Sequence, residues 1–182
     1  MRRALSFALA IPLVATAAVA LAAPIAIGDK VPANFTATDI AGKPRTFPSI
    51  AGKKGTVLIF FRSAAWCPYC QKQLKEVRAL PAELGKRGYS LAAISYDPPA
   101  TLAAFTAKQE VNYTLLSDAG SRMIDAFGLR DTNYAKDSPA FGVPRATILV
   151  INAEGVVQKK LTADDYKIRP NNDAILAAVD AG

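Results

Sequence analysis

Two cysteines separated by two residues, in the stretch Trp66-Cys67-Pro68-Tyr69-Cys70, carry the clearest chemical signal in this chain. They are the only cysteines among its 182 residues, so within the chain they can pair only with each other. An apolar run at 56–61 precedes them, and leucine and valine recur at helical spacing over 74–84. This pattern predicts a strand, a short loop and a helix, with the cysteines where the helix begins.

A helix start favours a thiolate over a thiol, because its first N–H groups lack partners and the helix dipole is positive there. We therefore predict that Cys67 is exposed and acidic, with Cys70 one turn behind it. Cys70 would then resolve a mixed disulfide formed on Cys67. Pro68 suits the first helical turn, where an N–H has no helical partner. Trp66 is expected to cover one side of the sulfur pair.

Other chemistries fit these residues poorly. A structural zinc site needs four ligands, usually Cys or His, and the chain has two cysteines and no histidine. The missing histidine also excludes a Cys–His hydrolase, and Gln71 stands where covalent haem attachment requires histidine. A structural disulfide remains an alternative, although closing so short a loop removes little entropy from the unfolded chain. We expect a redox-active pair without a metal or cofactor.

The first 22 residues have the pattern of a secretory signal peptide. Met1-Arg2-Arg3 precedes a long apolar run, and Ala20-Leu21-Ala22 has the small-x-small pattern of a cleavage site. A membrane anchor is the alternative, since the run is about long enough to span a bilayer, but Pro12 and the many alanines argue against it. We predict a periplasmic or secreted protein, or else one anchored in the membrane and facing the periplasm. Disulfides persist in such compartments.

The rest of the chain shows alternating strand and helix patterns that predict one α/β domain over residues 26–180. With 51% hydrophobic and 20% charged residues, the chain is long enough for one good core. The expected strands are 35–39, 45–47, 56–61, 89–95, 113–116, 144–151 and 156–160, and helices follow Cys70, Pro99, Asp118 and Asn171. Pro81 should kink or end the first helix near Leu80. The polar stretch 129–141 is expected to be a loop beside the active site.

These features together resemble the thioredoxin superfamily, and within it the peroxiredoxin-like branch of alkyl hydroperoxide reductase/thiol-specific antioxidant (redoxin) proteins. The matching residues are Gly28-Asp29, Pro32, Phe35, Asp39, Gly42-Lys43, 57–62, the CPYC motif at 67–70, 116–118, Ala146-Thr147, Asn152 and Gly155. The resemblance implies a thioredoxin-like fold, with a central mixed β-sheet flanked by helices. It also implies thiol-based redox chemistry at Cys67.

The chain departs from the family pattern at several positions. Peroxiredoxins carry Pro seven residues before the peroxidatic cysteine and Thr or Ser three before, where this chain has Phe60 and Ala64. Ser63 lies one residue further upstream. These differences weigh against efficient peroxidase activity, because a hydroxyl at the proper place helps to orient the peroxide.

Two positions near the predicted strand 144–151 leave alternatives open. Thioredoxins place a cis-proline opposite the cysteines, and that slot holds Ala146, so either Pro144 reaches the site through a bulge or the cis-proline is absent. Peroxiredoxins hold an arginine against the sulfur, and the candidates are Arg145 and Arg62, each of which could instead be a solvated arginine. Tyr69 can tune the cysteine pair by packing, and the alternative is that it simply covers the motif.

Our leading hypothesis is an exported thiol–disulfide oxidoreductase of the redoxin type, acting in redox homeostasis. Cys67 would attack a disulfide or a peroxide, and Cys70 would resolve the intermediate. The alternatives are a true thiol peroxidase and a non-enzymatic envelope binding module. The expected partners are a protein disulfide or dithiol or a small peroxide, with an unidentified electron donor. Nucleic acid is not expected, because the basic residues are not interleaved with aromatic ones, and membrane contact requires an uncleaved N-terminal segment.

Overall fold

The computed structural model describes residues 22–163 and 165–182. The predicted signal peptide, apart from Ala22, lies outside the described residues, so its cleavage and the alternative of a membrane anchor stay predictions. Within the described ranges, no helix combines the length and the apolar character needed to cross a membrane.

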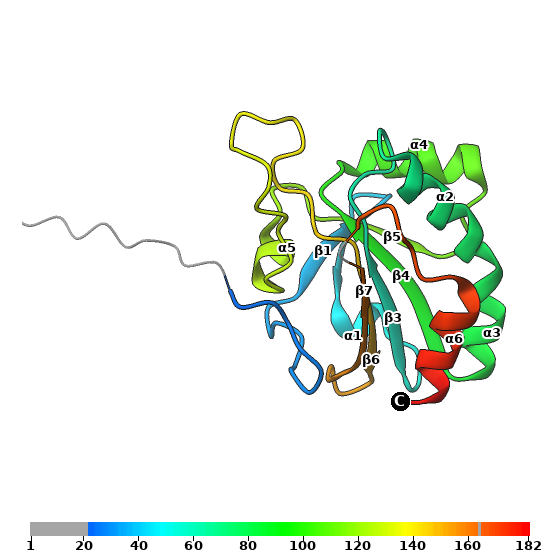
Figure 1. The fold of residues 1–182 in the computed structure, drawn as a ribbon. Coiled ribbons are helices and arrows are strands. Elements are labelled where there is room, and N and C mark those ends of the chain that lie inside the picture. The colour runs from blue at the N-terminus through cyan, green and yellow to red at the C-terminus, as the bar shows by residue number, and fades with distance from the viewer. Residues whose placement is uncertain (1–21, 164) are drawn as a thin grey trace, which may run out of the picture.

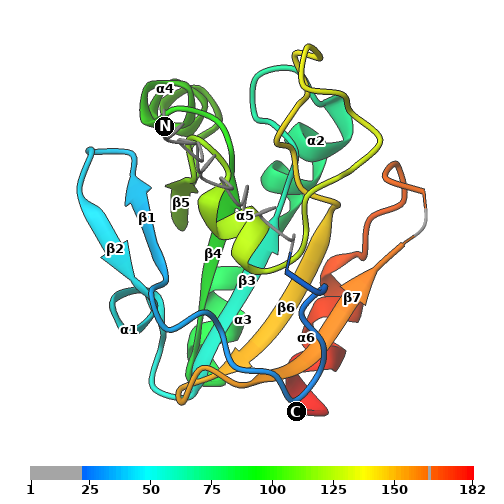
Figure 2. The same cartoon turned by 90° about the vertical axis from the view of Figure 1, so that its left-hand side faces the viewer.

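A mixed sheet of seven strands forms the centre of the described chain, in the order β2-β1-β5-β4-β3-β6-β7 (Figure 2). β3 pairs in parallel with β4 and antiparallel with β6, so the helical segment after the cysteines connects two neighbouring parallel strands. Every residue of β3 is buried, as its continuous apolar run predicts for a strand covered on both faces. The strands are β1 Thr36–Asp39, β2 Pro44–Thr46, β3 Gly55–Phe60, β4 Tyr89–Ser95, β5 Thr114–Ser117, β6 Thr147–Asn152 and β7 Val157–Thr162.

Helices cover both faces of the sheet (Figure 1). They are α1 Phe47–Ile50, α2 Pro68–Glu76, α3 Leu80–Lys86, α4 Pro99–Gln109, α5 Arg122–Ala126 and α6 Asn172–Asp180. Side chains alternate along β3, so Val57 and Ile59 pack under α2, α3, α4 and α6, whereas Leu58 and Phe60 pack under α1 and α5. The predicted α/β domain with a central mixed sheet flanked by helices is confirmed.

The helix after the cysteines is interrupted where the sequence predicts it. A single 3₁₀ turn, Val77–Ala79, separates α2 from α3, and Pro81 lies in the first turn of α3. Proline has no N–H to donate and its ring crowds the preceding turn, so the helix cannot pass through it unbroken. The short helix α1 was not predicted, because four residues are too few to show a helical period.

Candidate active site

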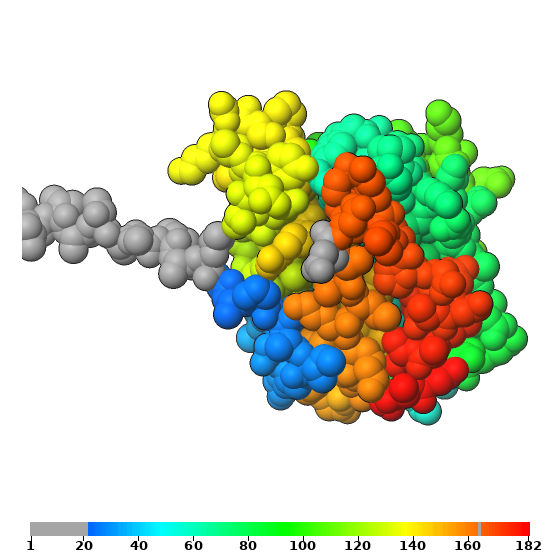
Figure 3. All heavy atoms as spheres, in the orientation of Figure 1, coloured from blue at the N-terminus to red at the C-terminus, as the bar shows by residue number. Residues whose placement is uncertain are grey.

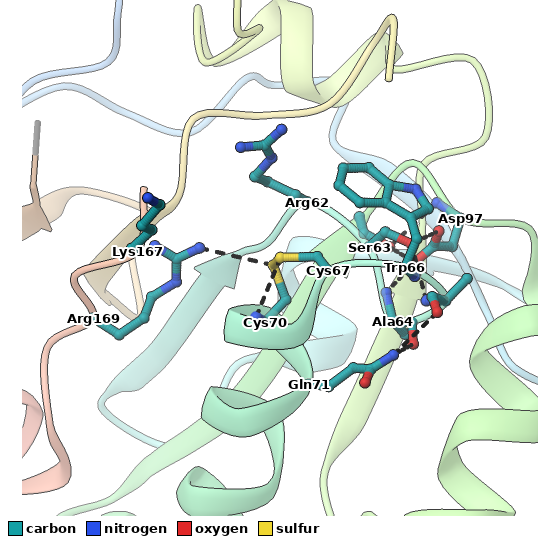
Figure 4. The surroundings of a disulfide bond; sticks show 12 residues. Arg62, Ser63, Ala64, Trp66, Cys67, Cys70, Gln71, Asp97, Lys167 and Arg169 are labelled. Carbon is teal, nitrogen blue, oxygen red and sulfur yellow. Dashed lines mark hydrogen bonds between the residues drawn. A yellow bond between two sulfur atoms is a disulfide. The ribbon is translucent and has the colours of Figure 1, made fainter. Parts of the chain in front are cut away.

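The two cysteines lie at the start of α2 and form a disulfide (Figure 4). Cys67 is the N-cap residue, and its sulfur accepts the backbone N–H of Cys70 at 3.2 Å. Pro68 is the first residue of α2, the position that its missing N–H favours. The disulfide therefore closes over the first turn of the helix that follows β3.

The prediction that Cys67 is exposed is wrong. Cys67 is 1% exposed and Cys70 is fully buried. The segment 165–170, which follows β7, packs against the motif: Tyr166 meets the ring of Tyr69 edge-on with 5.8 Å between ring centroids. Figure 3 shows this orange-red segment lying against the blue-green part of the chain that contains α2. We call segment 165–170 the cover.

Arg169, a residue of the cover, contacts the disulfide directly. Its Nη2 atom lies 3.8 Å from the sulfur of Cys70 (Figure 4). Burial lowers the pKa of Arg169, and the charge of Arg62 lowers it further. The guanidinium of Arg169 therefore places positive charge at the edge of the sulfur pair, and a thiolate formed on reduction would be stabilised there.

Arg62 follows β3 and is 3% exposed. The rings of Trp66, Tyr134 and Tyr166 surround its guanidinium, with the central carbon 5.3, 5.1 and 4.3 Å from their centroids. It donates to the hydroxyl of Tyr134, while Nε and Nη1 have no partner among the described residues. Cation–π contacts offset part of the cost of burying this charge. Tyr134 also confirms that the loop predicted at 129–141 reaches the site.

The aromatic residues of the motif lie on its outer side. Trp66 is 44% exposed and its indole N–H donates to the hydroxyl of Tyr96 at 3.0 Å. Tyr69 is 37% exposed and packs on the cover. Both rings are therefore partly exposed, and the cover of the sulfur pair by Trp66 stays a prediction.

A buried carboxylate, that of Asp97, holds the loop before Cys67. It accepts hydrogen bonds from the hydroxyl of Ser63 at 2.8 Å, the backbone N–H of Ala64 at 2.7 Å and the hydroxyl of Ser95 at 2.9 Å. The Ser63 hydroxyl is thus committed to the loop, and Ala64 has none to offer a substrate. Asp97 is a positioning residue in this arrangement.

Arg145 and Pro144 do not join the sulfur pair. Arg145 is exposed, donates to the backbone oxygen of Gly128 at 3.0 Å, and makes no hydrogen bond to either cysteine in the described part of the chain. Pro144 is buried and pairs with Arg130 in an isolated bridge. The described residues contain no cis peptide bond, so of the two alternatives for Pro144 the absence of a cis-proline holds. Both residues line a cavity together with Arg62.

The residues of the site that were not singled out from the sequence include Arg169, Tyr166, Tyr134 and Asp97. Asp97 had a usable signal, since it follows the carboxyl end of the predicted strand 89–95, and α/β proteins gather functional groups at the carboxyl ends of strands. Arg169 and Tyr166 had none, because no local pattern shows that their segment returns to α2.

The AhpC/TSA family model matches residues 27–160. The chain belongs to this family. Peroxiredoxin Bcp of Escherichia coli K12 is 30% identical over 153 residues, which cover 84% of this chain and 94% of that protein. A bcp protein of Haemophilus influenzae is 32% identical, covering 84% and 95%. Peroxidoxin BcpB of Mycobacterium tuberculosis has a crystal structure that matches with a TM-score of 0.72 at 27% identity, covering 85% of this chain and 96% of that one.

This AhpC/TSA protein is therefore a thiol-dependent oxidoreductase with a thioredoxin-like, peroxiredoxin-type fold. Its family membership argues against a non-enzymatic binding module with a purely structural disulfide. In the described chain the two cysteines available for thiol chemistry are Cys67 and Cys70, joined by the disulfide at the start of α2.

Proposed function

We propose that this protein reduces small peroxides, with Cys67 as the attacking thiolate and Cys70 as the resolving thiol. The observation that carries the proposal is the Cys67–Cys70 disulfide at a helix start, with Arg169 against it and Arg62 nearby. The similarity to proteins named peroxiredoxins supports it. Of the cations near the site, Arg169 takes the role that the resemblance suggested for Arg145 or Arg62.

The reaction begins from the reduced pair. The Cys67 thiolate attacks one peroxide oxygen, an S–O bond forms, the O–O bond breaks, and the leaving oxygen takes up a proton to depart as an alcohol or water. Cys67 is now a sulfenic acid. The Cys70 thiol attacks its sulfur, the S–S bond forms, and water leaves with the thiol proton. The disulfide returns to the dithiol with two electrons from an external thiol reductant.

The cover must move for this cycle to run, because Cys67 is 1% exposed in the disulfide form. The cover makes one aromatic packing on the motif, Tyr166 on Tyr69, and one weak contact to sulfur through Arg169. Tyr166 also makes a cation–π contact with the neighbouring Arg62. Contacts of this kind contribute about 0.5–1.5 kcal/mol each, so opening costs little. A small peroxide needs less opening than a folded protein disulfide.

Thiol–disulfide exchange with a protein partner is the second candidate. Two observations favour it: the two-residue spacing at the helix start, and the lack of a free hydroxyl where peroxiredoxins use Thr or Ser. Ala64 occupies that position, and Ser63 is bound to Asp97.

Rapid mixing of the reduced protein with hydrogen peroxide separates the two candidates. We expect a rate far above that of a free thiol, loss of this rate in Cys67→Ser, and a sulfenic acid that a dimedone probe traps in Cys70→Ser. A rate equal to that of a free thiol would reject peroxide reduction. If the same sample then reduced a protein disulfide with turnover, the second candidate would hold.

We also propose that the protein is exported, with residues 1–22 removed as a signal peptide, and acts as an antioxidant in the periplasm or outside the cell. The basic start, the apolar run and the small-x-small pattern at 20–22 support this proposal. N-terminal sequencing of the protein purified from its own cells tests it. A mature chain beginning at Ala23, give or take two residues, is the expected result, and an intact Met1 in a membrane fraction would instead favour an anchor.

A further inference from the structure

A cavity of about 380 Å³ lies next to the cover, against β6 and β7. Arg62 and Tyr166 line it, and both also contact each other beside the disulfide motif. Its wall holds three cations, those of Arg62, Arg145 and Lys160, and one carboxylate, that of Asp131. Cavities of a few hundred Å³ are large enough for small organic ligands. The net charge of this wall is positive.

Lys160 and Arg145 each make one hydrogen bond to a backbone oxygen in the described chain. Lys160 donates to the backbone oxygen of Ile25 at 2.7 Å, and Arg145 to that of Gly128 at 3.0 Å. Among the described residues, none of the three wall cations forms an ion pair. A lysine offers three donors and an arginine five, so Lys160 and Arg145 keep donors beyond these two bonds.

Arg62 provides an independent reason to expect an anion. It is 3% exposed, yet its Nε and Nη1 atoms have no partner in the described chain. Figure 4 shows its guanidinium pointing away from the sulfurs, whereas that of Arg169 points toward them. Burying this charge is costly, and a nearby anion would offset part of that cost. Because Nε and Nη1 are themselves buried, the anion would act on Arg62 through its charge and not through these two atoms.

The surroundings of Lys160 agree with this view. Burial lowers its pKa, and the charge of Arg145 lowers it further, while Asp29 raises it. The positive charges of Lys160 and Arg145 therefore repel each other, and a bound anion would relieve that repulsion.

We propose that this cavity binds the carboxylate of a small organic hydroperoxide, and so gives the enzyme a preference for anionic substrates. The assignment rests on the proposed peroxide reduction. Arginine side chains match a carboxylate with two parallel hydrogen bonds, and Arg145 is the exposed cation of the wall while Lys160 is partly buried.

Direct binding tests the cavity without any turnover. Calorimetric titration of the oxidised full chain with benzoate and with its neutral analogue benzamide should give affinities that differ by about tenfold, or about 1.4 kcal/mol. Arg145→Gln and Lys160→Gln should each weaken benzoate by about fivefold. Lys159→Gln is the matched control, because Lys159 is the neighbour on β7, faces the other side and is not in the wall. Equal binding of benzoate and benzamide, or equal losses in Lys159→Gln and Lys160→Gln, would overturn the proposal.

Turnover then tests the link to the substrate. We expect kcat/KM for a carboxylated cumyl hydroperoxide to exceed that for its methyl ester by about tenfold, and the ratio to fall toward one when Arg145 and Lys160 are both changed to Gln. A ratio of one in the unmodified enzyme refutes the substrate preference. If hydrogen peroxide is reduced but benzoate does not bind, only this inference fails. If hydrogen peroxide is not reduced, the proposed function fails, and benzoate binding still decides whether the cavity takes a carboxylate.

Discussion

Replacing Arg169 with methionine should raise the pKa of the Cys67 thiol in the reduced protein. Arg169 Nη2 lies 3.8 Å from the sulfur of Cys70, and a disulfide sulfur lies about 2 Å from its partner, so the cation is at most about 6 Å from the Cys67 sulfur. Unit charges at that separation interact by about 3 kcal/mol at an effective permittivity of about 20. This corresponds to about two pKa units. Because the pair rearranges on reduction, we expect a rise of about one to two units.

The same substitution should make the disulfide harder to reduce. A cation that stabilises the thiolate stabilises the reduced state, so its removal lowers the reduction potential. About 1.4 kcal/mol corresponds to 30 mV for a two-electron couple. The expected change is therefore about −30 to −60 mV in Arg169→Met.

The pH dependence of thiol alkylation in the reduced protein measures the pKa, and equilibration with a glutathione buffer measures the potential. Arg169→Lys keeps the charge and should retain most of the effect. Lys86→Met is a control for net charge, since Lys86 is 70% exposed at the far end of α3. A pKa in Arg169→Met no higher than in Lys86→Met would refute the electrostatic role of Arg169.

Three further outcomes follow from the site and its supports. Asp97→Ala should lower the free energy of unfolding by about 3 kcal/mol or more, measured by denaturant titration, because it strands three donors that now bind a buried carboxylate. Tyr166→Ala should speed reduction of the disulfide by a small dithiol about tenfold, since it removes the ring that packs on Arg62 and Tyr69. Burial raises the pKa of Asp118 above its ordinary 3.8, so the folded state binds this proton more tightly than the unfolded state does. The free energy of unfolding should therefore fall as pH rises from 3.8 through the raised pKa. Asp118→Asn should remove that fall.

Matched variants keep these outcomes specific. Asp137 is exposed, so Asp137→Ala should leave the unfolding free energy nearly unchanged. Tyr166→Phe keeps the ring and should keep the slow reduction. Equal dithiol rates in the Phe and Ala variants would show that the ring of Tyr166 does not protect the disulfide.

The sequence predicts the architecture well where the signal is local. The apolar run of β3, the helical spacing after Cys70 and the interruption before Pro81 all report short stretches of backbone, and each is confirmed. The position of the cysteines at the helix start follows from the same kind of signal. Helix α1 was not predicted, because its sequence has only a capping box and a proline to indicate a helix and is too short to show a helical period.

The surroundings of the cysteines depend on contacts that no local pattern encodes. Arg169 meets Cys70 across a separation of 99 residues, so the burial of Cys67 could not be read from the motif. The family pattern offered Arg145 and Arg62 as candidates for the cation at the sulfur. β6 begins at Thr147, two residues after Arg145, and Arg145 instead donates to the backbone oxygen of Gly128.

Trp66 is the sole tryptophan of the chain and adjoins the cysteine that cycles between two redox states. Its indole is half-exposed, 5.3 Å from the Arg62 guanidinium and hydrogen-bonded to Tyr96. Disulfides quench the emission of nearby indoles, so the intrinsic fluorescence of the protein should brighten on reduction and dim on oxidation. The fluorescence of Trp66 should therefore report the redox state of the disulfide during turnover, in real time and without any added dye.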